Sequence, residues 1–278
     1  MNKLKQYANK PLSFIALILI IISTLITALA IIFIIGYILI KGVPNLSADL
    51  FSLKYSSANQ SMLPSIINTV YLTALTLLLA VPVGIFSAIY LAEYARKSSF
   101  FVKIINVANE TLSGIPSIVY GLFGFLAFVI SKKWGYSLLA GVITLAIMVL
   151  PLIIRTSQEA MLGVDNSFRE ASYGLGAGKL RTVFKIVLPS AMPGILSGII
   201  LAIGRIVGET AALIYTAGTV PEAATSLTSS SRTISVHLYC LLNEGLYTEQ
   251  AYATAVVLIV FVVIINALSN FLAKKIIK

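Results

Sequence analysis

Long apolar runs alternate with short polar segments along the whole chain. Five runs hold about 20 predominantly apolar residues, enough to cross a hydrocarbon core of about 30 Å, and a sixth run is slightly shorter. The expected fold is an all-α polytopic membrane helix bundle with about six transmembrane helices. The predicted spans lie near Leu12–Ile40, Pro64–Ala92, Thr111–Ile130, Leu138–Ile154, Pro193–Ala217 and Ala251–Ala273.

Composition agrees with a membrane protein, because 58% of the residues are hydrophobic and only 11% are charged. Soluble domains have about 25% charged residues. The first run follows three lysines and contains Ala28-Leu29-Ala30, which resembles a signal-peptidase site. The apolar run nevertheless continues to Ile40, past the roughly 7–15 residues of a signal-peptide core. An uncleaved anchor is therefore favoured over a cleaved signal peptide.

The net charge of +10 would suggest a nucleic-acid partner in a soluble protein, but its distribution favours another explanation. With both termini cytoplasmic, fourteen basic residues fall in inner segments and five in outer loops. The inner residues are Lys3, Lys5, Lys10, Arg96, Lys97, Lys103, Arg155, Arg169, Lys179, Arg181, Lys185, Lys274, Lys275 and Lys278, and the outer ones are Lys41, Lys54, Lys132, Lys133 and Arg232. This positive-inside bias predicts a multi-pass membrane protein with an even number of spans, and no nucleic-acid partner.

Small residues are concentrated in the third predicted span, which includes Gly114, Pro116, Gly121 and Gly124. Gly114-Ile115-Pro116 invites a local break in the helix. Two interpretations are open for this segment: close packing between helices, or irregular backbone that lines a passage. Close packing is favoured because most small-residue patterns in membranes have that origin.

The longest outer segment, residues 218–250, contains apolar residues at helical spacing and predicts a short amphipathic helix on the outer surface. These residues are Ile234, Leu238, Leu241 and Leu242. The helix either packs onto the bundle or offers a docking surface. The single cysteine, Cys240, excludes an internal disulfide, and the single histidine, His237, argues against a dedicated metal site, so both are expected to be structural.

The longest inner segment contains the letters Gly-Ala-Gly-Lys, which invite comparison with a phosphate-binding loop. Such a loop requires a Ser or Thr directly after the lysine and a first glycine six positions before the lysine. Here Leu180 follows Lys179, and Tyr173 stands at the position of the first glycine. The segment is instead predicted to be an elbow over residues 159–189. Its expected helices are Glu159–Tyr173 and Lys179–Leu188, joined by a glycine-rich turn.

The elbow resembles the inner-loop signature of permease subunits of ATP-binding-cassette importers. That signature is Glu-Ala-Ala, three residues, Gly, nine residues and Ile-x-Leu-Pro, and this chain keeps every spacing with Ser172 for the second alanine. The resemblance implies a non-enzymatic subunit without a cofactor, whose elbow is a coupling helix docking on a separate ATPase that binds ATP and Mg²⁺. The residues implied in coupling are Glu170, Ala171, Gly176, Ile186, Leu188 and Pro189.

Arg205 and Glu209 lie well inside the fifth predicted span, four residues apart and therefore on one face of a continuous helix. Charges at this depth cost about 2.5–3.5 kcal/mol on insertion scales and usually serve function. Thr216, Gly198 and Gly194 would extend the face as a narrow pathway, and Gly204-x-x-x-Gly208 would pack beside it. A guanidinium suits a tetrahedral oxyanion, so Arg205, Glu209 and Thr216 are the predicted substrate pathway. Mutual neutralisation of the two charges is the alternative.

The runs "GIPSIVYGLFG", "GRIVGETAALIYTAG" and "SVHLY" narrow the resemblance to permeases of phosphate importers. That resemblance implies a second permease, two ATP-binding subunits and an extracytoplasmic phosphate-binding protein as partners. Residues 1–63 are expected to form an N-terminal tail, first helix and outer loop, and residues 64–275 the permease core. A sulfate or molybdate permease is the alternative within the family, followed by a secondary transporter and a membrane scaffold. Glu110 is expected to be a solvated interfacial carboxylate.

Overall fold

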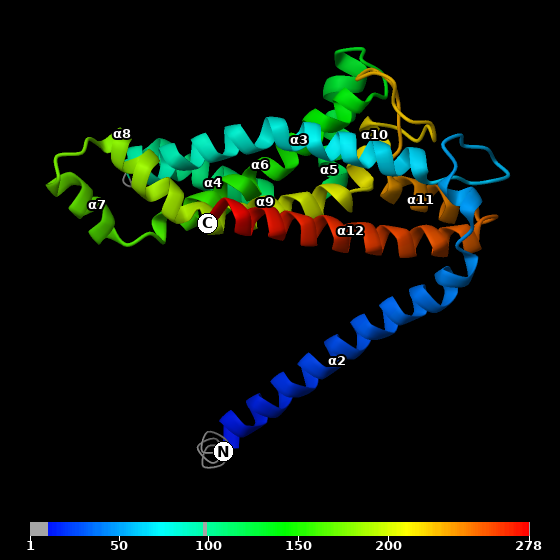
Figure 1. Cartoon of the computed structure of the whole chain (residues 1–278), viewed down its shortest axis with the longest axis horizontal. Coiled ribbons are helices and arrows are strands. Elements are labelled where there is room, and N and C mark those ends of the chain that lie inside the picture. Colours follow the sequence, from blue (N-terminus) through cyan, green and yellow to red (C-terminus); the bar gives the residue numbers. More distant parts are fainter. Residues whose placement is uncertain (1–10, 97–98, 278) are drawn as a thin grey trace.

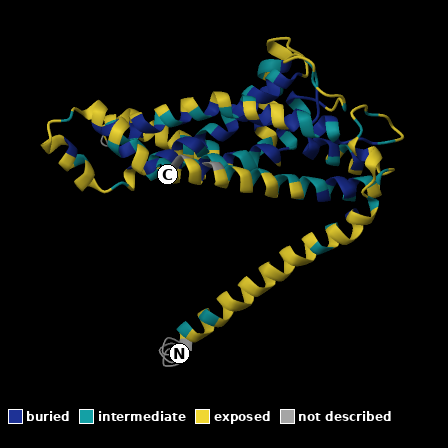
Figure 2. Ribbon diagram, viewed as in Figure 1, coloured by how far each residue is buried: buried dark blue, intermediate teal, exposed yellow. Residues whose placement is uncertain are grey.

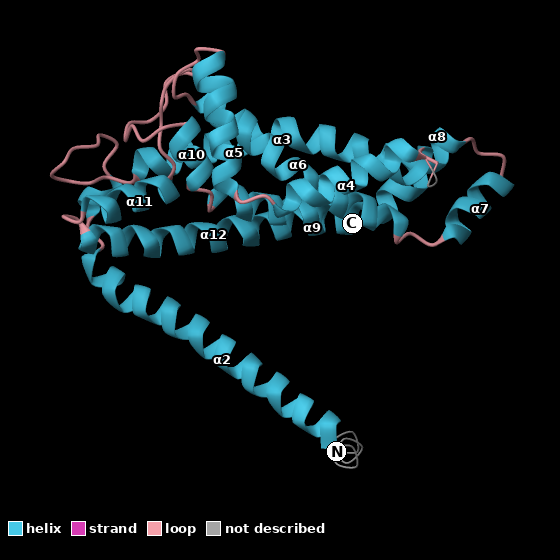
Figure 3. Cartoon of the chain, turned by 180° about the vertical axis from the view of Figure 1, so that it is seen from behind, coloured by secondary structure: helices cyan, strands magenta, loops and turns pink. Residues whose placement is uncertain are grey.

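The computed structural model describes residues 11–96 and 99–277, and within them every regular element is a helix (Figure 3). Lys3, Lys5, Lys10, Lys97 and Lys278 of the predicted inner charges lie outside the described residues. The α-helices are α2 (Pro11–Gly42), α3 (Leu63–Ile89), α4 (Phe100–Gly114), α5 (Ser117–Gly124), α6 (Leu138–Leu162), α7 (Asn166–Gly174), α8 (Lys179–Thr182), α9 (Leu188–Val207), α10 (Ala211–Thr216), α11 (Ile234–Glu244) and α12 (Thr248–Ile277). The shorter turns are the 3₁₀ elements η1 (Val43–Asn45) and η2 (Ala48–Phe51) and the π-helical elements η3 (Tyr90–Tyr94), η4 (Phe125–Ser131) and η5 (Val183–Val187).

The membrane-spanning content agrees with the predicted bundle. Five helical segments of the described chain are long and apolar enough to cross a membrane, and the count rises to six if one bent pair forms a span. Predicted and observed starts differ by one residue for the first two spans and coincide at Leu138 for the fourth. The fourth helix continues past the predicted end at Ile154 to Leu162.

The third predicted span, Thr111–Ile130, is not one straight helix. It begins inside α4, and α4 meets the segment formed by α5 and η4 at a bend of 102°. Ile115 is extended, with φ −70° and ψ 131°, because the following Pro116 disfavours helical geometry at the residue before it. The predicted break is therefore real.

Close packing is also found in this region, which confirms the favoured interpretation of its small residues. A Cβ added at Gly121 would lie 2.8 Å from the Cα of Ala212 in α10, and one at Gly124 would lie 2.7 Å from Cγ2 of Thr216. The glycines let the short helices α5 and α10 approach until their backbones touch.

The fifth span was predicted at Pro193–Ala217, and both of these bounds differ from those of the observed helical segment. The helical segment begins at Lys179, runs through α8, η5 and α9, and ends at Val207. Residues 208–210 interrupt the helix before α10 begins at Ala211. The predicted separate helix Lys179–Leu188 is thus the first part of the span.

The core of the bundle lies around α6, which packs between α3 and α9 (Figure 2). Apolar side chains from these helices, including Leu72, Leu145, Ile153 and Ile206, are almost wholly buried. Glycines bring both neighbours close to α6. A Cβ added at Gly84 of α3 would lie 2.6 Å from Cγ2 of Ile153.

Gly194 and Gly198 of α9 pack against the other side of α6. The prediction that these two glycines line a pathway is therefore wrong. A Cβ at Gly194 would lie 2.6 Å from the Cβ of Ala160, and one at Gly198 would lie 2.6 Å from the Cβ of Thr156. An added Cβ at Gly204 meets nothing within 4 Å among the described residues, so the packing motif predicted at Gly204 and Gly208 stays a prediction.

Helix α2 leaves the bundle at an angle and contacts α12 only near its own C-terminal end (Figure 1). None of its most apolar 18-residue window is buried in the described chain. The start of α2, the end of α12 and the α7–α8 elbow lie towards the left of Figure 1, and α11 lies towards the right. The elbow, the start of α2 and the end of α12 therefore lie on the opposite side of this view from α11.

Helix α11 confirms the helix predicted in the outer segment and packs into the bundle rather than on its surface. It contacts α12 and α3, and Ile234 and Leu241 are buried. Ile234 joins Leu50 from η2 and Met62 in one apolar cluster. The helix is therefore a structural part of the outer end, although Leu242 remains exposed.

Candidate functional site: a coupling elbow and a charged helix break

The predicted first arm of the elbow, Glu159–Tyr173, is two helices rather than one. Helix α6 ends at Leu162, and α7 starts at Asn166 after a short link. Asp165 caps α7 by accepting a hydrogen bond of 2.8 Å from the Ser167 amide. This hydrogen bond holds the pKa of Asp165 below its usual value. Helix α7 is consequently a separate arm that projects from the bundle (Figure 1).

The turn between the arms needs one glycine for its backbone. Gly176 has φ +81°, in the left-handed region that other residues rarely adopt. Gly174 and Gly178 do not have positive φ, and Gly178 is the N-terminal cap of α8. The Ala177 amide donates to the Ser172 carbonyl at 3.1 Å, which closes the turn. The predicted glycine turn is therefore confirmed.

A groove with a volume of about 410 Å³ lies along the elbow. Its lining combines small, apolar and basic side chains: Phe168, Ala171, Ser172, Leu175, Gly176, Ala177, Arg181 and Ile186. Three of the predicted coupling residues, Ala171, Gly176 and Ile186, are therefore brought together. Leu175 at the rim is 90% exposed, which is typical of a surface that another protein covers.

The remaining coupling residues surround this groove without lining it. Glu170 is exposed on α7, and Pro189 stands in the first turn of α9, where proline fits a helix. Leu188 packs against the buried layer formed by the ends of α3, α6 and α9. Ser172 departs from the family signature, and its hydroxyl forms a buried hydrogen bond of 2.8 Å with the Thr182 hydroxyl. The departure thus adds a tie between the two arms.

Sequence reasoning missed an ion pair beside the elbow. Arg169 of α7 contacts Glu93 of η3 at 2.6 Å, and both side chains are largely buried. The sequence pattern indicates only that Arg169 is an inner positive charge, and it gives no signal for Glu93. The two residues are 76 positions apart, so no local pattern in the sequence joins them.

The predicted helical pairing of Arg205 and Glu209 was wrong. Helix α9 ends at Val207, and Glu209 lies in the break before α10. The Glu209 carboxylate accepts a hydrogen bond of 3.0 Å from the Ala212 amide, at the start of α10. Among the described residues, no carboxylate lies within 4 Å of the Arg205 guanidinium. The break therefore separates the two charges and leaves Glu209 as a helix cap.

Arg205 stands in the last turn of α9, just before this break. At the other break, the Tyr120 hydroxyl of α5 donates to the Leu112 carbonyl of α4 at 2.8 Å. Thr216 is fully buried, and its hydroxyl donates to the Ala212 carbonyl at 2.8 Å. In this conformation Arg205 and Glu209 lie at the break between α9 and α10, whereas Thr216 belongs to the packing between α5 and α10.

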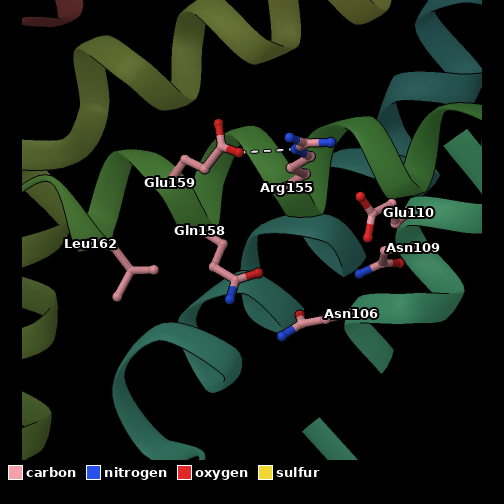
Figure 4. A pocket seen from close by; sticks show the side chains of 7 residues that line it. All are labelled: Asn106, Asn109, Glu110, Arg155, Gln158, Glu159 and Leu162. Atoms are coloured by element: carbon pink, nitrogen blue, oxygen red, sulfur yellow. Dashed lines mark hydrogen bonds and ion pairs between the residues drawn. The ribbon is translucent and has the colours of Figure 1, made fainter. Parts of the chain in front are cut away.

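A second polar pocket, of about 240 Å³, lies between α4 and α6 (Figure 4). Its lining residues are Asn106, Asn109, Glu110, Arg155, Gln158, Glu159 and Leu162. Arg155 donates to Glu159 at 2.9 Å across one helical turn, and both side chains are exposed. Glu110 is also exposed and faces Arg155 across the pocket, as expected for a solvated carboxylate near a basic residue. Two carboxylates and one guanidinium make the pocket a poor site for an anion.

The outer end contains a buried aromatic and basic cluster around His237. The Arg232 guanidinium lies 4.8 Å from the centre of the Tyr55 ring, and this ring meets the edge of His237. Burial and the neighbouring Arg232 charge lower the pKa of His237 from 6.5 to about 3. The histidine is consequently neutral at physiological pH and fills the space between the outer loop and α11. Burial also raises the pKa of the Cys240 thiol.

A bundle of apolar spans with two helix breaks and a projecting, grooved elbow defines a membrane permease that works with a separate soluble subunit. A comparison with protein families shows to which group of permeases the chain belongs. Residues 80–278 match the binding-protein-dependent transport system inner membrane component. The chain belongs to this family and is a membrane permease subunit of an ABC importer, in which separate ATPase subunits hydrolyse ATP.

Relatives align with most of the chain. A probable ABC transporter permease protein, YqgI of Bacillus subtilis, is 33% identical, and the alignment covers 87% of this chain and 88% of the relative. The phosphate transport system permease protein PstA of Yersinia pestis is 34% identical over 98% of this chain and 93% of the relative. A PstA 2 protein of Mycobacterium bovis is 37% identical over 76% and 72% of the two chains.

Solved structures share the fold at low sequence identity. A permease chain of a bacterial ABC transporter involved in the import of alginate gives a TM-score of 0.67 at 19% identity, covering 100% of both chains. A chain of the methionine transporter MetNI in an inward-facing conformation gives 0.59 at 18% identity, covering 75% of this chain and 93% of the other. These similarities support the helical arrangement alone.

Proposed function

We propose that the chain is a permease subunit of an ATP-driven phosphate importer. The main support for the proposal is the position of Arg205 beside the helix break that follows Val207, without a carboxylate within 4 Å among the described residues. A guanidinium that no side chain neutralises is suited to bind an oxyanion by parallel hydrogen bonds. The relatives named as phosphate permeases favour phosphate over sulfate or molybdate.

Glu209 has a different role in this proposal from the one its sequence spacing predicted. Its carboxylate caps α10, and the Ser235 hydroxyl donates to its backbone carbonyl at 2.6 Å. It therefore fixes the break beside Arg205 and keeps a negative charge away from the guanidinium. Arg205 contacts the anion during translocation, and Glu209 orients the half-helix that follows.

The proposed complex contains a second permease of the PstC type, two ATP-binding subunits and an extracytoplasmic phosphate-binding protein. Helix α2 has an apolar surface that is exposed along nearly its whole length in the single chain, and either lipid or a second membrane subunit would cover it (Figure 2). The elbow docks on an ATP-binding subunit, which places the elbow and both ends of the chain in the cytoplasm. ATP and Mg²⁺ bind to the partner subunits.

The test is uptake of radioactive phosphate by the assembled importer in proteoliposomes, with Arg205→Gln in this chain. Loss of a hydrogen bond to a charged group predicts roughly 10- to 100-fold slower uptake. Arg96→Gln, which changes an exposed inner arginine, is the matched control and should transport normally. Full uptake by Arg205→Gln would exclude the proposed contact. Stronger competition by sulfate or molybdate would favour the alternative substrates, and uptake without an ATPase would indicate a secondary transporter.

A further inference from the structure

The cytoplasmic end of α3 touches both arms of the elbow. The helix widens there into the π-helical turn η3, Tyr90–Tyr94. Such turns are rare and are often found at functional sites, because the extra residue changes the direction of the following side chains. In this chain the turn carries Glu93 and Tyr94, each of which contacts a basic residue of the elbow.

The contact with α7 is a nearly buried ion pair. The Nε and Nη2 atoms of Arg169 donate to Oε1 of Glu93 at 3.1 and 2.6 Å, and the two side chains are only 13% and 6% exposed. The same guanidinium donates to the carbonyls of Met161 and Val164, each at 2.8 Å. Arg169 therefore joins three elements: its own helix α7, the end of α6 and the end of α3.

The contact with α8 is a cation–π interaction. The Nζ atom of Lys179 lies 4.8 Å from the centre of the Tyr94 ring. A buried apolar layer lies next to these polar contacts and includes Ile89 from α3, Met161 from α6 and Val183 from η5. The end of α3 is thus packed against the base of the elbow as well as bonded to its arms.

The covalent connections of α7 do not explain how it could transmit a displacement. Non-helical links, residues 163–165 and 175–178, bound the helix on both sides. A short helix between two such links would swing without moving the bundle unless noncovalent contacts held it. Breaking a buried charge pair leaves an uncompensated charge and is strongly unfavourable, so the Arg169–Glu93 pair resists such a swing.

We propose that Glu93 and Tyr94 form a clamp, through which a displacement of the elbow reaches α3 directly, in addition to its route along α8 and α9. In this proposal Glu93 is a positioning residue that couples ATP hydrolysis to movement of the spans. The inference rests on the proposed role of the elbow in docking an ATPase subunit. It adds a second span, α3, to the span Lys179–Val207 that the elbow moves.

Glu93→Gln tests the clamp because Glu93 lies outside the groove and the variant keeps the side-chain shape. The measurement is radioactive phosphate imported per ATP hydrolysed by the assembled importer in proteoliposomes. We expect this ratio to fall about tenfold, within the range produced by altering residues that couple two sites. Glu93→Asp should recover part of the ratio. Glu159→Gln is the matched control, since it removes the exposed pair with Arg155 and should leave the ratio unchanged.

The outcomes separate the clamp from the elbow assignment. If the ATPase subunits do not co-purify with the unaltered chain, the proposed docking fails. If they co-purify and Glu93→Gln imports as much phosphate per ATP as the unaltered importer, the clamp alone is refuted. If Glu93→Gln does not fold, Lys179→Met and Tyr94→Leu carry the test. Both alter exposed residues and should lower the ratio by about twofold, and an unchanged ratio would overturn the clamp.

Discussion

Replacement of Gly198 by alanine tests the packing of α9 against α6. The new Cβ would lie 2.6 Å from the Cβ of Thr156 and closer still to its hydroxyl. That hydroxyl donates to the Leu152 carbonyl at 2.8 Å, so its position is fixed. Rotation of the Thr156 side chain cannot move its Cβ. The overlap can therefore be relieved only by separating the two helix backbones.

The size of the effect follows from a comparison within one helix. Gly204 lies six positions further along α9, and an added Cβ there meets nothing within 4 Å. Alanine at either position gains the same helix propensity of about 0.5–1 kcal/mol over glycine. The difference between the two variants therefore isolates the overpacking, which typically costs 1–3 kcal/mol. We expect a value of about 3 kcal/mol, because two Cβ atoms collide and neither is flexible.

The assay is unfolding of the purified chain in lipid nanodiscs, followed by fluorescence in increasing denaturant. Gly204→Ala should be slightly more stable than the unaltered chain, and Gly198→Ala clearly less stable. Adding Thr156→Gly to Gly198→Ala should restore part of the loss, since it removes the opposing Cβ. Equal stability of the two alanine variants would refute the packing and revive the pathway interpretation of this face.

Two further predictions concern the outer cluster and the elbow. The pKa of His237 is about 3 when folded and about 6.5 when unfolded, so protonation of the unfolded chain should lower stability as pH falls below 6.5. At pH 5 the loss should be about 2 kcal/mol; His237→Phe should remove that component, and an unchanged pH profile would contradict it. Gly176→Trp should keep membrane insertion but abolish ATP-driven phosphate uptake, because the φ of +81° strains any other residue and the indole would fill the groove. Normal uptake by that variant would disprove the elbow assignment.

The spans were predictable because their signal is local and long. A continuous apolar run reports the length of a helix through the membrane, whatever its neighbours are. The breaks are harder to read from such runs, because apolar residues continue across them. Pro116 gave a recognisable signal, whereas Gly208 was interpreted as part of a packing motif although it ends α9. The division of the chain at residue 63 stays a prediction.

In the elbow, too, only part of the side-chain arrangement could be predicted from the sequence. The resemblance to the permease signature identified Ala171, Gly176 and Ile186, and the structure brings these residues to one groove. The spacing of Arg205 and Glu209 gave a wrong prediction, because the two side chains share a face only on a continuous helix and the helix ends between them. The pair formed by Arg169 and Glu93 depends on how distant elements meet. Such contacts require the fold and cannot be read from periodicity.

The helix is continuous from the elbow to Arg205, so the break that follows determines how far a displacement of the elbow is transmitted. The segment Lys179–Val207 has 29 residues and begins in the second arm of the elbow. At 1.5 Å per residue, Arg205 is about 40 Å along this helix from Lys179. A displacement of the arm would therefore be carried to the guanidinium by one helical segment. The break after Val207 lets α10 and its cap Glu209 remain packed on α5 while Arg205 moves, so the position of the break decides which charge follows the elbow.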